Sequence, residues 1–407
     1  GKFFTLRTIV NFMTEILDPR EGELVCDPCC GTGGFLISAF EYMKAQIETD
    51  IENQKKTIRK KLEGKNFDKL SENEQNKIIE KINMNFAQLN MDLELGNPNS
   101  RIYDLSYRCI YGTDAEPRSA RTAKMNMIMH GDGHGGVHHH DGLINVNGIF
   151  PNRFDVILTN PPFGATVSRE LELSDEDRYK DVAKIEYYTE RYGEDYTRAL
   201  KSVTDNIGKK LIKLFELGKL STLTEVLFME RCLTLLKPGG RMGVVLPEGL
   251  LNGQQLQSVR DFFEGKAKII FIVSIPQDVF KSAGATVKPS LVFLKKFSEE
   301  EQNSYVEICK SVESEVNNKY ELIFKSYNKK IEEIETEIQK EKLTNDKKKL
   351  SDLKKQLAEN KKTIKPLLKE LEKKRNNEIK DKVKELFDYQ IPIAQVEKAG
   401  ITSTGDK

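Results

Sequence analysis

The sequence predicts an α/β fold with a doubly wound, mainly parallel sheet of the seven-stranded type, followed by a charged, coiled-coil-like helical arm. Three observations support this prediction. Short apolar runs alternate with helical segments through most of the chain. A glycine-rich turn at residues 31–34 joins the first apolar run to a helix. From about residue 312 the sequence becomes dense in Lys, Glu, Asn and Gln around a narrow apolar repeat.

The strand candidates are short apolar runs at residues 24–27, 109–112, 154–159, 241–247, 268–275 and 290–295. Helices are expected between them at residues 34–47, 120–129 and 224–236, the last closed by a Lys-Pro-Gly-Gly stop signal at 237–240. Residues 48–100 predict an exposed, charged helical insertion, and residues 131–142 a loop rich in Gly and His. Because parallel strands carry ligands at their carboxyl ends, we expect the functional residues there.

We expect an α/β domain over residues 1–310, a helical hairpin over 311–388 and a return to the globular body over 389–407. Apolar residues of the hairpin recur at the spacing of a coiled coil, at Tyr327, Ile331, Ile334 and Ile338 and again at Leu350, Leu353 and Leu357. Residues 344–346 are the candidate start of the second helix, which Pro366 is expected to kink or interrupt. The hairpin is interpreted either as a solvated spacer or as a docking arm for another subunit.

The composition limits the classes of function. At 407 residues the chain exceeds a typical single domain, and its formal charge of +1 gives no overall attraction to nucleic acid. The six cysteines do not form a disulfide framework, and no apolar run reaches membrane-spanning length. We therefore expect a soluble, cytoplasmic protein with reduced thiols. Because the chain starts at Gly1 without methionine and ends abruptly at Lys407, we also expect a fragment of a longer polypeptide.

The glycine-rich turn has the form of a cofactor site. It follows Asp27 at the end of a candidate strand and opens a helix, whose first N–H groups have no intrahelical partner. The next strand ends at Asp114, where a carboxylate would meet the two hydroxyls of a ribose. An ordinary tight turn and an ordinary turn residue are the alternatives. The pattern G-x-x-x-x-G-K-[ST] is absent, which argues against ATP hydrolysis by this chain.

The segment Asn160-Pro161-Pro162-Phe163 directly follows the apolar run 154–159. The prolines stiffen the turn, and the alternative is that Asn160 only forms that turn. The Asn160 side-chain oxygen and the Pro161 carbonyl are suited to accept hydrogen bonds from an exocyclic amino group, while Phe163 stacks on a planar base. Together with the glycine turn, this motif predicts methyl transfer to a base nitrogen, in which positioning does most of the work.

Five histidines lie within one eleven-residue window, at His130, His134, His138, His139 and His140. Cys26 and Cys29 form a C-x-x-C pair. Neither group has a second half at the spacing of a zinc site, so the sequence favours a polar loop and no metal.

These motifs resemble those of the modification (methyltransferase) subunits of type I restriction-modification systems, which are adenine-N6 DNA methyltransferases with the S-adenosylmethionine-dependent methyltransferase fold. The resemblance covers residues 1–297 and extends to 389–407. It implies that the cofactor, S-adenosylmethionine, is bound by Phe3, Phe4, Thr5, Asp27, Cys29, Gly31, Thr32, Gly33, Gly34, Phe35, Asp114, Asp141 and Leu143. It implies that the catalytic segment is Asn160, Pro161, Pro162 and Phe163. Departures from the family pattern are Leu6 in place of proline, Cys29 in place of alanine and Asp114 in place of glutamate.

The resemblance also implies the partners: double-stranded DNA, a specificity subunit, a restriction subunit and a second modification subunit, in the cytoplasm of a prokaryote. The amino-terminal helical domain of the family is not in this sequence. The same catalytic motif leaves open N4-cytosine, RNA or protein methylation. A non-catalytic, cofactor-binding assembly subunit is the competing class of function.

Overall fold

The structure is a computed structural model that describes residues 5–133, 135–178, 180–277, 288–344 and 347–396. The chain divides into two compact units. One unit contains Gly1–Ser298 with Ile391–Lys407, and the other contains Glu299–Gln390.

The first unit is built on a sheet that has eight strands within the described residues, in the order β3-β2-β1-β4-β5-β7-β6-β8. The strands are β1 (Val25–Asp27), β2 (Ile110–Asp114), β3 (Val137–His139), β4 (Phe154–Thr159), β5 (Leu236–Pro247), β6 (Ala267–Ser274), β7 (Pro289–Lys296) and β8 (Ile393–Gln395). Neighbours from β3 through β5 are parallel, as are β6 and β8, whereas β7 is antiparallel to β5 and β6. The predicted α/β class with a mainly parallel sheet is confirmed.

The α-helices of this unit are α1 (Arg7–Leu17), α2 (Gly34–Glu63), α3 (Glu72–Asn90), α4 (Arg101–Asp104), α5 (Pro117–Met129), α6 (Val182–Thr204), α7 (Thr224–Leu235), α8 (Glu248–Asn252) and α9 (Gln257–Glu264). The helix expected at 34–47 continues to Glu63. The segment 131–142 was expected to be a loop, but it contains β3. The Gly112 N–H of β2 donates to the Gly136 carbonyl, and the residues that follow Gly136 pair with β2 as an additional edge strand. The expected helix stop at 237–240 lies inside β5.

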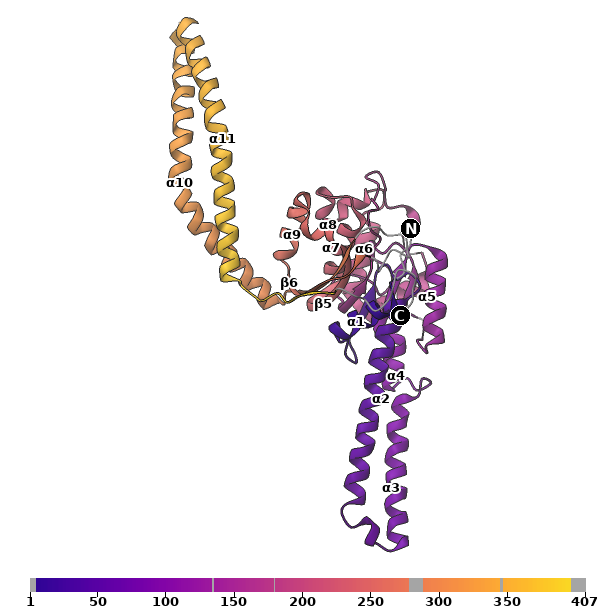
Figure 1. Cartoon of the computed structure of the whole chain (residues 1–407). Coiled ribbons are helices and arrows are strands. Elements are labelled where there is room, and N and C mark those ends of the chain that lie inside the picture. The colour runs from indigo at the N-terminus through magenta and orange to yellow at the C-terminus, as the bar shows by residue number, and fades with distance from the viewer. Residues whose placement is uncertain (1–4, 134, 179, 278–287, 345–346, 397–407) are drawn as a thin grey trace. The chain divides into compact units, whose positions relative to one another are not determined.

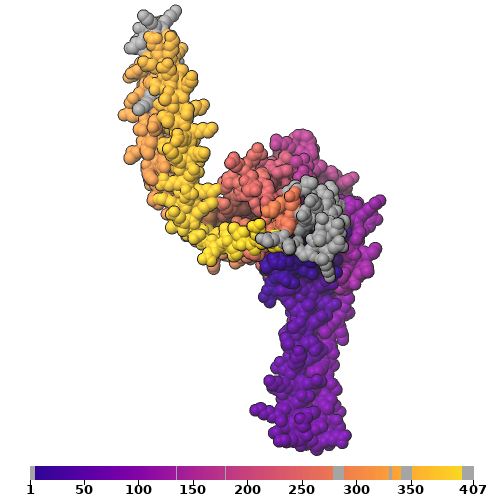
Figure 2. Space-filling view, viewed as in Figure 1, coloured from indigo at the N-terminus to yellow at the C-terminus, as the bar shows by residue number. Residues whose placement is uncertain are grey.

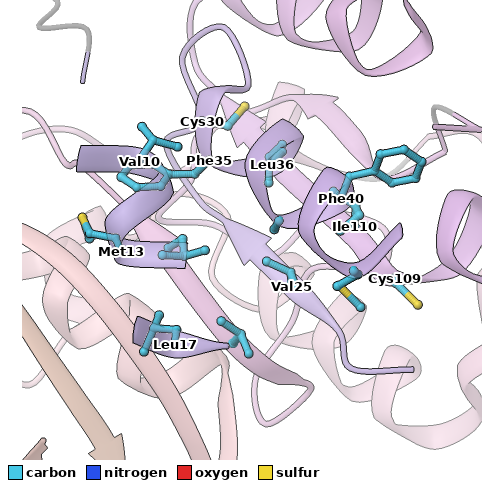
Figure 3. Packing of buried hydrophobic residues seen from close by; sticks show 14 of the residues in the cluster. Val10, Met13, Leu17, Val25, Cys30, Phe35, Leu36, Phe40, Cys109 and Ile110 are labelled. Atoms are coloured by element: carbon cyan, nitrogen blue, oxygen red, sulfur yellow. The ribbon is translucent and has the colours of Figure 1, made fainter. Parts of the chain in front are cut away.

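Apolar clusters cover both faces of the sheet. Val25 and Cys26 of β1 belong to different clusters because successive side chains of a strand point to opposite faces. Figure 3 shows the cluster in which α1 and α2 pack on β1 and β2. Met13 of α1 and Leu36 of α2 are fully buried there. The core thus fixes the start of α2, and with it the glycine turn that precedes this helix.

The charged segment 48–100 forms the far half of α2 together with α3, which lie side by side as a helical pair (Figure 1). Within residues 48–90, Ile51 of α2 and Ile82 of α3 are buried, whereas the other side chains are exposed or half-buried. Figure 2 shows the pair as a column of side chains that projects from its unit. This segment therefore adds surface and contributes little to the core under the site.

The second unit is a helical pair formed by α10 (Glu299–Thr344) and α11 (Lys347–Leu386). The pair begins with α10 at Glu299, which is earlier than the start expected from the change in composition at about residue 312. Ile338, Leu353 and Ile364 are buried, and Val312, Val316 and Val383 form a small cluster near the base of the pair. Helix α11 continues through Pro366 without interruption. The seam positions Ile331 and Leu350 lie outside the described side chains.

After the hairpin the chain returns to the first unit, where β8 pairs with β6 through Ile393 and Ile272. Residues 397–407, expected to continue this body, lie outside the described residues.

Candidate active site

Three strands bring the predicted residues to one edge of the sheet. Asp27 ends β1, Asp114 ends β2, and Asn160 directly follows β4. Strand β1 lies between the other two and is parallel to both. Their carboxyl ends therefore meet, which places both acids and the carboxamide at one edge of the sheet, where parallel α/β sheets bind their ligands.

Asp27 organises the turn that follows β1. Its Oδ1 atom accepts hydrogen bonds from the Cys29 N–H at 3.0 Å and from the Thr159 hydroxyl at 2.7 Å. The Cys29 thiol lies 2.9 Å from the same hydroxyl. Thr159 is the last residue of β4, so these contacts join the glycine turn to the strand that precedes Asn160. Thr159 is a site residue that the sequence interpretation missed.

The buried position of Asp27 changes its ionisation. The carboxyl is 1% exposed, and burial raises its pKa to about 7, although hydrogen bonds from Thr159 and Cys29 favour the charged form. The negative charge of Asp114 raises it further. Burial also raises the pKa of the Cys29 thiol well above its usual value, so this thiol is held in its neutral form.

Asp114 holds the glycine turn from the neighbouring strand. Its Oδ2 atom accepts from the Gly31 N–H at 3.0 Å, and its Oδ1 atom accepts from the Glu116 N–H at 2.8 Å. Gly31 and Gly33 have φ values of 55° and 89°, which disfavour any residue with a side chain. A Cβ added at Gly31 would meet no atom within 4 Å, so a ligand has room to approach the backbone there.

A second loop closes the crevice beyond β3. The Asp141 carboxylate accepts from the Leu143 N–H at 2.9 Å, and Leu143 is buried in an apolar cluster against which Cys29 also packs. A Cβ at Gly142 would lie 1.8 Å from the Pro28 carbonyl oxygen, so this loop and the cofactor turn touch through backbone atoms.

Helix α7 holds that loop through Arg231, another residue that the sequence interpretation missed. The buried Arg231 guanidinium donates to the carbonyls of Gly142 and Ile144, both at 3.0 Å, and to the Asn145 side-chain oxygen at 2.7 Å. These three acceptors lie on the loop beyond β3. Arg231 therefore sets the position of the loop against the glycine turn.

The side chain of Asn160 is held by its amide nitrogen, which leaves its amide oxygen as an acceptor for a ligand. The Nδ2 atom of Asn160 donates to the Thr5 hydroxyl at 3.0 Å. Its Oδ1 atom is buried and accepts no hydrogen bond from the part of the chain that the structure describes. A buried carboxamide oxygen without a partner is costly, so such an atom at a crevice is suited to a ligand that donates an N–H. The neighbouring Pro161 is buried and Pro162 is exposed.

Phe163 and the segment after it pack against two different elements. The half-buried Phe163 ring lies against the core cluster that contains α1 and α2. The next N–H, that of Gly164, donates to Glu225 Oε1 of α7 at 3.3 Å. Glu225 is 4% exposed, its Oε2 atom has no partner within the described residues, and burial raises the pKa of its carboxyl. The sequence did contain a signal for Glu225 and Arg231, because both are charged residues in the mainly apolar helix α7.

The remaining predicted residues are less central to this geometry. Phe35 is buried in the core, and the Thr32 carbonyl accepts from the Asn126 side chain at 2.9 Å. Gly34 begins α2. Phe3 and Phe4 lie outside the described residues, as does His134. Where the structure describes the chain, no three or more His, Cys, Asp or Glu side chains are placed to hold a metal ion, and none of the helices is both long and apolar enough to cross a membrane.

Comparison with known proteins agrees with the resemblance. The Type I restriction enzyme EcoEI methylase subunit of Escherichia coli is 24% identical over 298 residues, which cover 73% of this chain and 42% of that protein. The EcoKI methylase subunit of Escherichia coli K12 is 23% identical over 301 residues, which cover 73% of this chain and 40% of that protein. The chain thus spans about two fifths of the length of these relatives.

Solved structures give similar matches. The crystal structure of the EcoKI M protein has 21% sequence identity and a TM-score of 0.46, covering 74% of this chain and 45% of that one. A modification subunit of a putative type I restriction enzyme from Vibrio vulnificus has 22% identity and a TM-score of 0.44, covering 73% and 45%.

The N-6 DNA Methylase family matches residues 1–107, 95–212 and 213–367. The match extends into α10 and α11, beyond the limit at residue 297 that the motifs indicate. The resemblance to type I modification subunits is confirmed, and the chain belongs to the N-6 DNA Methylase family.

Proposed function

We propose that this chain is the catalytic part of a type I modification subunit that transfers a methyl group from S-adenosylmethionine to N6 of adenine in double-stranded DNA. The observation that carries the proposal is the Asn160 side-chain oxygen, which is buried at the crevice without a partner among the described residues. Thr5 holds the amide nitrogen, so the oxygen is the atom presented to a substrate amino group.

The chemistry follows from three groups of the catalytic segment. The Asn160 oxygen and the Pro161 carbonyl each accept one hydrogen of the adenine amino group, which directs the nitrogen lone pair and stabilises the positive charge that develops on it. The half-exposed Phe163 ring replaces part of the stacking that the adenine loses when it leaves the duplex. Bound S-adenosylmethionine supplies an activated methyl group, so the residues contribute position and need no strong general base.

The crevice residues fit a positively charged donor that contains a ribose. Asp27 and Asp114 provide two carboxyl groups, and the hydrogen-bond partners of the Asp27 carboxyl are a hydroxyl and an N–H, neither of them cationic. The outer face of Gly31 is open to a ligand. We assign Asp114 to the ribose, the turn 31–34 to the amino-acid part of the donor, and the loop that contains Asp141 and Leu143 to the adenine.

We further propose that the first unit is the methyltransferase domain and that the helical pair α10 and α11, expected at 311–388, docks on another subunit of a cytoplasmic restriction-modification complex. Relatives named as type I methylase subunits support this. The formal charge of +1 fits a chain whose DNA affinity is supplied by a specificity subunit. A restriction subunit and a second modification subunit complete the proposed complex.

The test is Asn160→Ala in the full protein assembled with its specificity subunit. We expect methylation to fall by at least about a hundredfold, with S-adenosylmethionine affinity nearly unchanged. The control is Asn53→Ala, at an exposed asparagine of α2, which should methylate like the wild type. Methylation at the wild-type rate by Asn160→Ala would refute the mechanism. Mass spectrometry of nucleosides identifies the acceptor, since N4-methylcytosine in place of N6-methyladenine would refute the adenine assignment.

A further inference from the structure

A cavity lies at the opposite edge of the sheet from the candidate active site. It has a volume of about 740 Å³, within the range of small-molecule sites. It is lined by Tyr103, Tyr107 and Arg108, which precede β2, by Gly133 before β3, and by Tyr111 inside β2. These segments are at the amino ends of their strands, whereas Asp114 lies at the carboxyl end of β2.

One wall of the cavity comes from the short helical segment before β2. The rings of Tyr103 and Tyr107 are stacked with centroids 4.3 Å apart, and the Arg108 guanidinium lies 5.9 Å from the centre of the Tyr103 ring. Arg108 also pairs with Asp104 at 2.8 Å. A Cβ at Gly133 would lie 2.5 Å from the Tyr107 ring, so the loop before β3 leaves space for that ring.

The facing wall comes from α6 and carries Tyr187, Tyr188, Glu190 and Arg191. One Arg191 nitrogen donates to the Tyr187 hydroxyl at 2.8 Å. No carboxylate pairs with Arg191 in the described parts of the chain. A guanidinium has five N–H donors in a planar fork, so Arg191 keeps donors for an anionic ligand group.

This wall is fixed to the sheet by aromatic and cationic contacts. The Tyr192 hydroxyl of α6 lies 2.9 Å from the Tyr111 hydroxyl and accepts from Arg153 at 2.9 Å. The Arg153 guanidinium lies 4.1 Å from the centre of the Tyr111 ring and 4.3 Å from that of Tyr192. The two walls are therefore held apart by a packed layer, which makes the cavity a feature of the fold.

We propose that this cavity binds a nucleotide, either free or as one unit of a single strand. Stacked tyrosines provide flat faces for a base, as in proteins that bind single-stranded nucleic acid. Arg191 and Arg108 provide donors for the phosphate, and the exposed Glu190 carboxylate is an acceptor for ribose hydroxyls or a base amino group. The site is separate from the proposed methyl-transfer crevice and does not depend on that proposal.

The experiment measures binding of adenosine monophosphate, adenosine and inorganic phosphate to the whole chain by calorimetry. Saturating S-adenosylhomocysteine is present in one series, because the candidate cofactor crevice would also accept adenosine. We expect the nucleotide to bind better than either fragment and to remain bound in that series. We expect Arg191→Gln to weaken the affinity for adenosine monophosphate about tenfold. The control Lys201→Gln, at an exposed lysine of the same helix, should leave this affinity unchanged.

Because Arg191 is half-buried, the exposed Tyr107 on the other wall gives a second test. Tyr107→Leu should weaken the affinity for the nucleotide by a similar factor. Thermal unfolding followed by circular dichroism checks that each variant is folded. A short single-stranded oligonucleotide is compared with adenosine monophosphate to identify the natural ligand. If the oligonucleotide binds at least about tenfold more tightly, with the same dependence on Arg191, the ligand is a nucleotide unit of a single strand. If the two affinities are equal, the ligand is a free nucleotide. The proposal is overturned if no nucleotide binds, if S-adenosylhomocysteine displaces it, or if both variants bind like the wild type.

Discussion

The ionisation of Asp27 gives a prediction that can be worked out from the structure. In the folded protein burial raises its pKa to about 7, from the ordinary value of 3.8. Between these pH values the folded chain binds more protons than the unfolded chain, so the free energy of unfolding falls as the pH rises. The contribution is fully present below pH 3.8 and is lost as the pH passes through about 7.

The magnitude follows from the size of the shift. A change of about three pKa units corresponds to about 4 kcal/mol, at about 1.4 kcal/mol per unit. The substitution Asp27→Asn removes the titration, while its amide oxygen is still able to accept from Cys29 and Thr159. We therefore expect the free energy of unfolding of the variant, relative to the wild type, to rise by up to about 4 kcal/mol between pH 4 and pH 8.

The assay is urea denaturation followed by circular dichroism at unit pH intervals, without cofactor. Glu225 and Glu230 are also acids with raised pKa values, but they are present in both proteins and cancel in the difference. The control Asp68→Asn removes an exposed carboxyl and should follow the wild-type profile. Parallel curves for Asp27→Asn and the wild type from pH 4 to pH 8 would refute the reasoning, because they require a carboxyl that is ionised throughout.

Three further predictions test the loops at the candidate site and the helical pair of the second unit. Replacing Glu225 with Ala should lower kcat about tenfold or more with little change in cofactor affinity, because the Gly164 N–H loses its acceptor. The variant Glu225→Gln keeps an acceptor and should retain most of the wild-type rate. Equal rates in both variants would count against a positioning role for Glu225. Gly142→Ala should destabilise the fold by about 1–3 kcal/mol in denaturation and weaken cofactor binding, whereas Gly249→Ala has open space and should be neutral in both measurements. Deletion of 320–386 should keep cofactor affinity and abolish co-purification with the specificity subunit, and unchanged assembly would reduce the hairpin to a spacer.

Strand β4 and the position of the main candidate site residues could be predicted from the sequence for a simple physical reason. Strand β4 has the predicted bounds because its apolar run is buried along its whole length and ends at the Asn-Pro turn. Parallel strands place their carboxyl ends together, so Asp27, Asp114 and Asn160 meet without any knowledge of the loops. Local pattern and the rule of parallel sheets are sufficient for this part of the site.

The contacts that fix the loops could not be predicted in the same way. Strand β3 was missed because it has three residues in a segment rich in Gly and His, and its pairing depends on the partner strand. Helix α6 was missed because Gly193 interrupts its helical geometry and most of its surface is polar. Glu225 and Arg231 are visible in the sequence as charges in an apolar helix, but the sequence does not say which distant loop each one holds.

These two charges give α7 a role beyond covering the sheet. Glu225 holds the segment after the proposed catalytic motif, and the Thr224 N–H donates to the Ala165 carbonyl at 2.9 Å. One turn and a half further along, Arg231 holds the loop that touches the cofactor turn. A single rigid helix thus sets the positions of the loops proposed to bind the acceptor base and the donor. Since methyl transfer by this mechanism depends on the distance between donor and acceptor, substitutions that tilt α7 should reduce the rate even when both ligands still bind.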